Sequence, residues 1–332
     1  MVEFATGILA TGSYLPKEEI TNDELAPTAG VDVDWILRKT QIVTRRYAAP
    51  DEAASDLAAR AGQEALDRLG LEPEDIDLLI VSTSTPDHPQ PPTACLVQKM
   101  LGAWRAACFD INAVCSGFVY ALDVARGMLA LRPGATALVI ASDVYSRILD
   151  YTDRRTAVLF ADGAGAAVLG PVPAPYGIFD VSLATRGEAH HLIGVEAGGS
   201  RTPASHETVD NGDHFFRMNG RAVRDFVLAE VPIALRDFAR RAGVGLEEIK
   251  HFVPHQPNGV MLGELADRAG LVNARVHRTV ERYGNVGSAS VPVTLDDANR
   301  AGLIADGDLV LLCGFGGGMA IGSALVRWSR TA

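Results

Sequence analysis

The sequence predicts an α/β protein made of two similar halves packed together. In the first half, the helical periodicity of Ala53–Leu71 gives way to the continuous apolar run of a buried strand over Ile76–Thr85. The same order recurs in the second half, where the helical "VPIALRDFARRAGV" precedes the strand-like "LEEIKHFVPHQPN". Ile76 and Ile249 fall at matching places before the two strands, so the offset is about half the chain.

Two further repeats occur at a similar offset. Gly134–Asp143 matches Gly307–Gly318, because each is a buried strand entered from a glycine turn. Phe160–Gly170 matches Gly316–Val326, and in each a glycine-rich turn is followed by an apolar strand that closes its half. Three repeats, each offset by about half the chain, indicate a duplicated α/β unit.

The proline-rich segment Gly170–Gly177 lies between the repeats and is the expected connector. We therefore expect an N-terminal half over residues 1–172 and a C-terminal half over residues 173–332. In such an architecture the site is expected in a cleft between the halves, near the strand ends.

The composition excludes several classes of protein. With 332 residues, 48% hydrophobic and 21% charged, and with no low-complexity run, the chain is typical of a globular protein. No apolar run approaches the roughly 18 to 20 residues of a membrane span, and the first residues form no basic leader, so we expect a cytoplasmic protein that does not bind membranes. The net charge of −11 argues against nucleic-acid binding, although a local basic patch could still hold CoA.

The cysteines do not form a metal-ligand pattern. Cys95, Cys108, Cys115 and Cys313 lack the CxxC spacing of zinc and redox sites, and no His-Glu-x-x-His helix occurs. We therefore expect reduced thiols, no metal and no cofactor.

Cys115 is the leading candidate for a nucleophile. It lies in "DINAVCSGFVYAL", where a strand-like run gives way to a helical one, so it falls at the N-terminus of the expected helix. There the unpaired amides and the helix dipole stabilise a thiolate, and the small neighbours Ala113, Ser116 and Gly117 leave room for a thioester. A cysteine at this place can equally be a small core residue, and the local sequence leaves both interpretations open.

Two polar residues of the second half could serve such a nucleophile. His255, in "VPHQPN", follows a buried strand run instead of lying inside it, although a lone histidine there could be structural. Asn285, in "YGNVGSAS", lies in a tight glycine loop, where asparagine is commonly only turn chemistry. The glycine run "CGFGGG" would let the backbone approach a ligand closely, and its amides could form an oxyanion hole.

Arg217, Arg221 and Arg224 are spaced as a basic stripe on one face of an expected helix. Such a stripe is usually only a solvated face. On an acidic protein it is also where an anionic carrier protein or CoA could dock.

Taken together, "DINAVCSGF", "VPHQPN", "YGNVGSASVP" and "FGGGMAIGSALVRW" resemble the signature set of β-ketoacyl-acyl-carrier-protein synthase III, the initiating ketosynthase of the thiolase superfamily. The segment "DYTDRRTAVLFADGAGAAVLG" belongs to the same set, and the resemblance covers nearly the whole chain. No single motif is decisive, but their order and spacing together are specific. The resemblance implies a thiolase-like fold of five alternating layers, αβαβα, assembled as a homodimer.

The resemblance also implies an activity and a set of catalytic residues. The family performs a decarboxylative Claisen condensation of a starter acyl-CoA with a malonyl thioester, carried by a carrier protein or by CoA. Cys115, His255 and Asn285 match its Cys-His-Asn triad. Gly317 matches the glycine whose amide joins that of Cys115 in the oxyanion hole.

Three further residues match substrate-binding positions of the family. Trp35 and Arg154 match the pair that sandwiches the CoA adenine, which favours acyl-CoA as first substrate. Asn258 matches the asparagine of the His-Gln-x-Asn motif.

The chain departs from the family at three places. Val260 stands where the fatty-acid enzymes have an arginine that is important for carrier-protein docking, and Lys39–Gln41 replaces the usual Arg-Thr-Gly. Gln90 stands where some members have an aromatic residue that limits acyl length from the dimer partner. These departures favour a specialised relative, such as a starter-unit enzyme of a natural-product pathway, and would move carrier docking to the arginine stripe.

Other functions fit the same residues less well. A synthase III-like acyltransferase would pass the Cys115 acyl group to a hydroxyl or amine of a small molecule without condensation, but such relatives tend to lose the asparagine that Asn285 retains. A cysteine hydrolase would use Cys115 and His255 without needing the Asn285 loop, and a non-catalytic binding protein would need none of the three. We therefore expect condensation.

Overall fold

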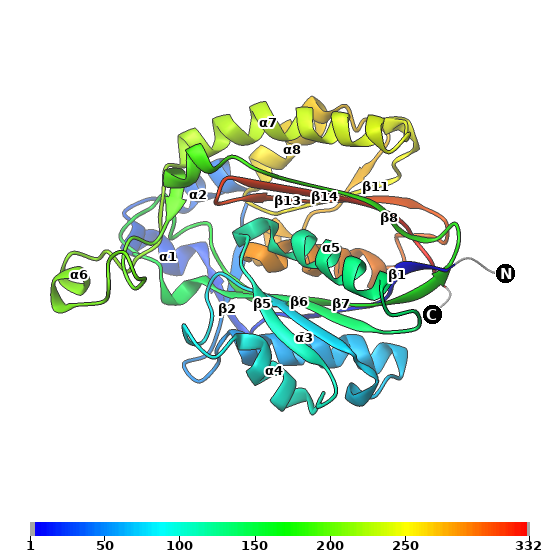
Figure 1. Ribbon diagram of the computed structural model, residues 1–332. Helices are drawn as coiled ribbons and strands as arrows, with labels where there is room; N and C mark the ends of the chain where they lie inside the picture. The colour runs from blue at the N-terminus through cyan, green and yellow to red at the C-terminus, as the bar shows by residue number, and fades with distance from the viewer. Residues whose placement is uncertain (1–3, 331–332) are drawn as a thin grey trace.

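The computed structural model describes residues 4–330 and consists of five alternating layers of helices and sheets. Figure 1 shows two sheets separated by a layer of central helices, with further helices on the outer face of each sheet. The αβαβα layers and the duplication that the sequence predicts are therefore confirmed.

Both sheets have five strands in the same order. The first runs β1-β7-β6-β4-β5 and the second runs β8-β14-β13-β11-β12. In each sheet the first three strands are antiparallel to their neighbours and the last three are parallel. The strands of the first sheet are β1 (Phe4–Tyr14), β4 (Leu78–Ser82), β5 (Ala107–Ile111), β6 (Ala137–Val144) and β7 (Asp162–Pro173), and those of the second are β8 (Gly177–Thr185), β11 (His251–Pro254), β12 (Arg275–Val276), β13 (Leu309–Gly316) and β14 (Ala320–Arg327).

The strand register shows that the sheets are copies of one unit. Leu78 pairs with Ala137 in the first sheet, and His251 pairs with Val310 in the second. Adding 173 to each number of the first pair gives the second pair. The matching isoleucines of the sequence repeat have the same separation, so the offset inferred from the sequence is that of the fold.

Helices cover the sheets in pairs. The central layer consists of α5 (Gly117–Ala130) and α10 (Ser290–Arg300), each of which contacts both sheets. The helices α3 (Ala54–Leu69) and α4 (Thr93–Leu101) cover the first sheet, whereas α7 (Gly220–Arg241) and α8 (Gly259–Ala269) lie over the second. Within residues 4–330, no helix has the length and apolar character needed to cross a membrane.

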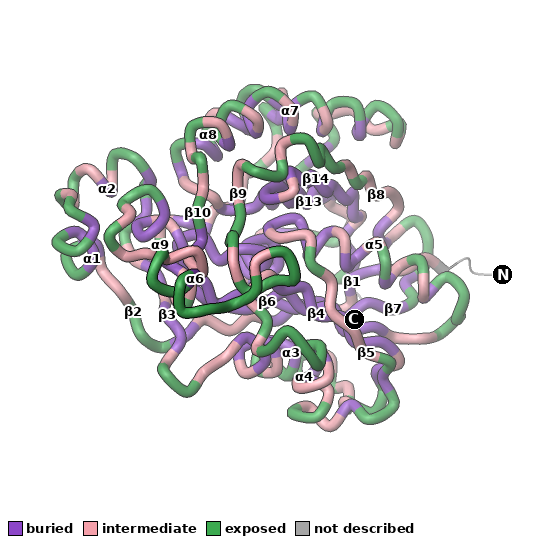
Figure 2. The backbone as a smooth tube through the Cα atoms, turned by 60° about the vertical axis from the view of Figure 1, so that its left-hand side comes forward, coloured by how far each residue is buried: buried purple, intermediate pink, exposed green. Residues whose placement is uncertain are grey.

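Smaller elements extend from this frame on one side. Figure 2 shows buried residues concentrated in the sheets, whereas most of the loop that carries α6 is exposed. The elements outside the two main sheets are β2 (Glu18–Thr21), α1 (Asn22–Ala29), α2 (Val33–Thr40), β3 (Thr44–Tyr47), β9 (Ile193–Gly194), α6 (His206–Asp210), β10 (Arg217–Met218) and α9 (Val280–Tyr283).

The third sequence repeat differs from the structure in detail. Gly163 and Gly165 lie within β7 and not in a turn before it, because Val293 and Pro292 pack so closely on this strand that a Cβ at Gly165 would lie 2.7 Å from the Val293 nitrogen. The strand also continues to Pro173, so the connector between the sheets spans only residues 174–176. The division into halves at residue 172 stays a prediction.

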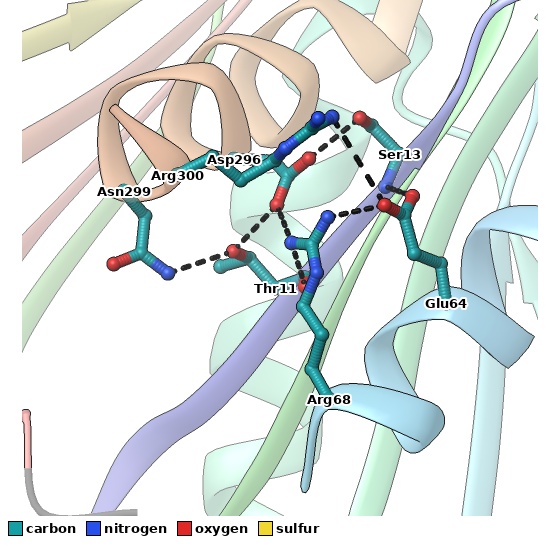
Figure 3. Close-up of polar contacts among 7 residues, drawn as sticks. All are labelled: Thr11, Ser13, Glu64, Arg68, Asp296, Asn299 and Arg300. Carbon is teal, nitrogen blue, oxygen red and sulfur yellow. Dashed lines mark hydrogen bonds and ion pairs between the residues drawn. The ribbon is translucent and has the colours of Figure 1, made fainter. Parts of the chain in front are cut away.

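A buried carboxylate ties the two halves together (Figure 3). Asp296 of α10 is fully buried and accepts hydrogen bonds from Thr11 Oγ1 at 2.8 Å and from Ser13 Oγ at 2.6 Å, both on β1. Arg68 of α3 forms an ion pair with the same carboxylate and donates to the Thr11 carbonyl at 2.7 Å. Glu64 pairs with the other side of the Arg68 guanidinium. Since these residues come from β1, α3 and α10, the network fixes α10 on the first sheet.

We expect Asp296→Ala to destabilise the protein by about 3–5 kcal/mol, because it leaves the half-buried Arg68 without its carboxylate and strands two hydroxyl donors. The neighbouring Asp297→Ala is the matched control, since Asp297 pairs with Arg282 at 2.8 Å in an exposed position where such pairs contribute about 0–1 kcal/mol. Urea denaturation measures both values. Equal losses in the two variants would contradict the role of the buried network.

Candidate active site

Cys115 lies in a strained turn at the start of α5. After β5 ends at Ile111, the 3-10 turn η2 (Val114–Ser116) leads directly into the helix. Val114 has φ 47°, a left-handed conformation that is rare for a β-branched residue and costs of order 1–3 kcal/mol. Cys115 itself is 5% exposed. The structure thus puts Cys115 at the helix N-terminus, as the sequence predicts.

Glycines of β13 allow this turn to lie against the second sheet. A Cβ on Gly314 would lie 2.8 Å from Ser116 Cα, and a Cβ on Gly316 would lie 3.0 Å from Cys115 Sγ. Glycine is therefore required at both positions for close approach. The cavity beside the thiol exists because no side chain from β13 fills it.

His255 is held at the end of β11. Its backbone N–H donates to the Cys313 carbonyl of β13 at 2.7 Å. The next residue, Gln256, is fully buried, and its amide makes four hydrogen bonds to the backbone, among them bonds from the N–H groups of Thr279 and Val280 at 3.0 and 3.2 Å. A buried amide with four partners is rigid, so it fixes the loop on which His255 lies.

Asn285 is fixed by a segment of the first half. Its N–H donates to the Leu159 carbonyl and its carbonyl accepts from the Ala161 N–H, both at 2.9 Å. Gly284, with φ 66°, makes this approach possible, since a Cβ there would lie 3.1 Å from the Leu159 oxygen. Asn285 Oδ1 accepts the N–H of Gly287 at 3.0 Å. With Oδ1 used in this turn, the Nδ2 group is the donor that Asn285 can offer to a substrate.

The three predicted residues surround one cavity with about 40 Å³ of free space. Cys115, His255 and Asn285 line it together, although they lie on three separate segments of the chain. Apolar side chains form most of the remaining wall, including those of Phe160, Phe216, Met218, Val227 and Phe315.

The thiol and the imidazole are both uncharged at neutral pH. Burial raises the pKa of Cys115 far above its usual range, and the nearby Asp143 carboxylate raises it further. Burial lowers the pKa of His255 to about 3. The thiolate that the helix N-terminus leads one to expect is therefore opposed by desolvation, and the resting site is not a thiolate–imidazolium pair.

The duplication generates a second centre, the turn around Ser288, which corresponds to the turn around Cys115. The offset of 173 relates Cys115 to Ser288 and Asn112 to Asn285, each pair lying at the same place in a turn that leads into a central helix. In both turns the asparagine Oδ1 accepts the N–H two residues later, at 3.1 Å in the first and 3.0 Å in the second. The two turns therefore have the same hydrogen-bond pattern.

A carboxylate fills the second centre. The same offset relates Gly316 to Asp143, which is fully buried. Asp143 Oδ2 accepts the N–H and the hydroxyl of Ser288 at 2.7 and 2.8 Å, and Oδ1 accepts those of Ser84 at 2.8 and 2.9 Å. One copy of the turn thus faces an open cavity, and the other faces a closed hydrogen-bonded cluster.

A cleft of about 910 Å³ leads from the surface to Asn285. Trp35 and Arg154 both line it, with the guanidinium carbon 5.7 Å from the centre of the indole ring. Six basic side chains line the cleft, namely Lys39, Arg154, Arg155, Arg217, Arg221 and Arg224. On a chain with a net charge of −11, this cleft is a local basic patch.

The prediction that the three arginines form a stripe on one helix face is wrong. Asn219 caps α7, so the helix begins after Arg217, which lies in β10 and pairs with Asp150 at 2.9 Å. Arg224 lies on α7 but pairs with Glu264 of α8 at 2.5 Å. All three arginines nevertheless line the cleft.

The remaining predicted residues have varied surroundings. Asn258 lines the cleft and caps α8 by accepting the Met261 N–H at 2.8 Å. Gly317 lies against the turn before Cys115, where a Cβ would lie 3.2 Å from the Val114 side chain. Gln90 lies on an exposed loop and lines neither the cavity nor the cleft. Gln41 has φ 60°, which explains why glycine is usual at its place in the family.

Sequence reasoning missed three buried residues that shape the site. Gln256 lies inside the motif "VPHQPN", but its position next to His255 does not show that its amide holds the loop. Asp143 is near the end of β6 and Tyr145 directly follows it, so the strand-end signal that identified His255 could have found them.

Comparisons with known proteins agree with this geometry. The family models of 3-oxoacyl-[acyl-carrier-protein (ACP)] synthase III and of its C-terminal region match residues 109–187 and 239–328. The chain is 52% identical to acetoacetyl CoA synthase NphT7 of Streptomyces sp. strain CL190 over 330 residues, which are 99% of this chain and 100% of that protein. It matches the structure of 3-oxoacyl-(acyl carrier protein) synthase III, FabH, from Pseudomonas aeruginosa PAO1 with a TM-score of 0.90 and 34% identity, over 98% and 99% of the two chains. It also matches the priming β-ketosynthase of the R1128 polyketide pathway with a TM-score of 0.90 and 32% identity, over 99% and 98% of the two chains.

We expect Gly316→Ala to slow modification of Cys115 by an acyl-CoA by about 100-fold or more, because the new methyl group would displace the sulfur. Mass spectrometry of the Cys115 peptide measures the rate. Gly127→Ala is the matched control, since it lies within α5 with no neighbouring atom near its Cβ position, and it should keep the normal rate. A normal rate in Gly316→Ala would contradict the proposed fit between β13 and the nucleophile.

We expect part of the acid sensitivity of folding to come from His255. Its pKa of about 3 in the folded protein lies below the ordinary value of 6.5, so the unfolded chain binds more protons at acidic pH. This contribution to stability is complete above pH 6.5 and decreases as the pH falls, by about 2 kcal/mol at pH 5. Urea denaturation above pH 6.5 and at pH 5 should show a smaller decrease in the free energy of unfolding for His255→Gln than for the wild type. An equal decrease in both proteins would mean that His255 is charged when folded.

Proposed function

This chain belongs to the 3-oxoacyl-[acyl-carrier-protein] synthase III family, and we propose that Cys115, His255 and Asn285 perform its reaction. That reaction is the decarboxylative condensation of an acyl-CoA with a malonyl unit, which initiates fatty-acid or polyketide-type chains. One observation carries the assignment: the three side chains come from separate segments and line a single cavity at the end of a basic cleft.

In the first half-reaction the Cys115 sulfur attacks the thioester carbonyl of the starter. A C–S bond forms to the acyl carbon, the bond to the CoA sulfur breaks, and CoA leaves as the thiol. The backbone N–H groups of Cys115 and Gly317 would hold the oxyanion that develops on the carbonyl oxygen. In this step the enzyme is an acyltransferase that moves the acyl group onto its own thiol.

In the second half-reaction a malonyl thioester occupies the cavity. The neutral imidazole of His255 and Nδ2 of Asn285 donate hydrogen bonds to its carbonyl oxygen, which becomes an enolate oxygen when CO₂ leaves. The enolate carbon attacks the acyl carbon, the C–S bond to Cys115 breaks, and the released thiolate takes a proton from water to restore the thiol. Neither donor protonates the enolate, since an amide cannot titrate and His255, with its pKa of about 3, is not protonated.

The cleft supports a starter that is bound to CoA. Its basic side chains suit the CoA phosphates, and Trp35 and Arg154 suit the adenine. A flat base between them needs a separation of about 7 Å, so the pair would open from 5.7 Å by about 1 Å on binding.

The small cavity favours a short starter such as acetyl. Its free space of about 40 Å³ has room for only about three water molecules, which matches a two-carbon acyl group and not a long chain. The similarity to a protein named acetoacetyl CoA synthase points to the same starter length.

The charges near the cleft favour malonyl-CoA over malonyl carrier protein as the second substrate. Glu264 pairs with both Arg224 and Arg268, and Arg224 also lies beside Asp225, so these two cations are less available to an acidic carrier protein. Val260, where the fatty-acid enzymes have an arginine, is exposed beside them on α8.

We also propose a cytoplasmic homodimer. Among residues 4–330, the edge strand β5 pairs with β4 alone, so its other side could pair with a second copy, and exposed apolar side chains of Met100 and Trp104 precede it. Four free cysteines suit a reducing compartment.

A loading and condensation assay tests this function. Wild-type protein is incubated with acetyl-, butyryl- or octanoyl-CoA, the Cys115 adduct is measured by mass spectrometry, and malonyl-CoA or malonyl carrier protein is then added. We expect the fastest loading with acetyl-CoA, followed by release of CO₂ and a β-ketoacyl product with malonyl-CoA. A Cys115 adduct that yields no CO₂ with either malonyl donor would contradict condensation.

Variants assign the roles. We expect no adduct in Cys115→Ala, and in Asn285→Ala we expect normal loading but CO₂ release reduced by about 100- to 1000-fold, because one enolate donor is lost. Asn299→Ala is the matched control, since that amide bonds to Thr11 in the buried network of Figure 3. An adduct in Cys115→Ala would overturn the assignment of the nucleophile.

A further inference from the structure

Two of the free cysteines are in contact at the edge of the first sheet. Cys95 Sγ on α4 lies 3.7 Å from Cys108 Sγ on β5. Both residues are partly exposed, whereas Cys115 and Cys313 are buried. We propose that Cys95 and Cys108 form a redox-active pair, which a hydroperoxide converts into a disulfide before it oxidises Cys115. The pair lines neither the cavity nor the cleft, so this inference is independent of the condensation.

Hydrogen bonds hold α4 on β5 on both sides of the pair. At the start of α4, the N–H groups of Thr93 and Ala94 donate to the Asp110 carboxylate of β5 at 2.6 and 2.7 Å. Further along the helix, Gln98 Nε2 donates to the Ala106 carbonyl just before β5 at 2.8 Å. None of these bonds involves a sulfur atom. The contact between the two thiols is therefore set by the way the helix is fixed on the strand.

A bridge between the two sulfurs needs only a small movement. A disulfide bond is about 2.05 Å long, so the sulfurs must approach by about 1.7 Å in total, which rotation of the two side chains can share. Cys108 packs against the apolar cluster between the first sheet and its outer helices. Its side chain therefore points to the α4 face of the sheet and not along the free edge of β5. Pairing of that edge with a second copy would leave the two thiols facing each other.

The surroundings make Cys95 the thiol of the pair that ionises first. Burial, the contact with Cys95 and the nearby Asp110 carboxylate raise the pKa of Cys108 to about 11. Cys108 therefore keeps its hydrogen and donates it to the Cys95 sulfur, which favours a thiolate there. Cys95 also lies in the first turn of α4, where the helix dipole favours a thiolate, although the Asp110 carboxylate at the same helix end offsets part of this effect.

The buried cysteines are protected from the same oxidant. Burial raises the pKa of both Cys115 and Cys313, so little thiolate is present at either position. Oxidation of a cysteine needs both a thiolate and access from solvent. The pair meets these conditions better than the nucleophile does, and an oxidant that reaches it is reduced there instead of at Cys115.

Atoms and electrons balance with a hydroperoxide as the oxidant. The Cys95 thiolate attacks one oxygen of hydrogen peroxide, the O–O bond breaks, and a sulfenic acid forms while hydroxide leaves. Cys108 then attacks the Cys95 sulfur, so the S–S bond forms and the S–O bond breaks. The two thiol hydrogens end in two molecules of water. The two sulfurs together lose two electrons, which the peroxide gains.

Treatment with hydrogen peroxide and peptide mass spectrometry test the site. Trypsin cleaves at Lys99 and Arg105, between the two cysteines, so a bridge joins two peptides. In the wild type we expect these linked peptides, lighter by two hydrogen atoms, to appear at least about tenfold faster than any oxidised Cys115 peptide. Dithiothreitol should separate them again. Oxidation of Cys115 before the bridge forms would overturn the proposal.

Variants assign the role of each sulfur. In Cys108→Ser the sulfenic acid on Cys95 has no thiol to attack it, so dimedone should capture it there. In Cys95→Ser the Cys108 thiol should stay reduced under the same treatment. Cys313→Ala is the matched control, since it removes a buried cysteine away from the pair, and it should form the bridge at the wild-type rate. A covalent dimer on a non-reducing gel in place of the linked peptides would overturn pairing within one chain.

Thermal unfolding tests whether the bridge fits the folded protein. A disulfide that closes a loop of about 15 residues without strain should raise the unfolding midpoint of the oxidised wild type by about 3–5 °C. Cys108→Ser should show no such increase after the same treatment. An unchanged or lower midpoint in the oxidised wild type would overturn the fit of the bridge to this fold.

These outcomes are distinct from a failure of the proposed function. The bridged protein should still take an acetyl group from acetyl-CoA on Cys115, because the pair lies outside the cavity. Loss of loading on bridging alone would overturn the independence of the two sites. A protein that forms the bridge but loads no acyl group in either redox state would contradict the proposed function and still confirm the redox-active pair.

Discussion

The contact between the Cys115 turn and β13 is the constraint on which the site depends. Gly314 and Gly316 put the strand against the turn so closely that a Cβ at Gly316 would lie 3.0 Å from the sulfur. The same strand holds the histidine, since the carbonyl of Cys313 accepts the His255 N–H at 2.7 Å. One strand therefore sets the spacing between nucleophile and imidazole. The strain at Val114 is local evidence that the turn conforms to this contact and not to its own preference.

Duplication explains how one fold holds both an open site and the cluster that supports it. The two turns that lead into α5 and α10 are copies, and the positions that face them are Gly316 in one case and Asp143 in the other. Without a side chain, Gly316 leaves room for substrate beside Cys115. With a carboxylate, Asp143 closes the other centre by binding Ser288 at 2.7 and 2.8 Å. The difference between the copies is thus one of side-chain volume and charge on a common backbone.

The repeats in the sequence were sufficient to predict the duplicated fold, because buried strands and glycine turns leave strong local patterns. The triad came from motif resemblance, and strand-end position agreed with it for His255. The arginine stripe failed because helical spacing alone cannot reveal that Asn219 starts the helix after Arg217. The end of β6 could have drawn attention to Asp143 and Tyr145, but the contact of Asp143 with Ser288 joins the two halves, and no local pattern encodes such a contact.

A resting site without charge on the thiol or the imidazole suits a reaction that passes through several anions. An imidazolium in the resting site would protonate the enolate, and a thiolate in the resting site would react with any electrophile that entered the cleft. Burial prevents both, since it lowers the pKa of His255 to about 3 and raises that of Cys115. The same burial, together with the nearby Asp143 carboxylate, makes it costly to create a thiolate at Cys115 before a thioester occupies the cavity.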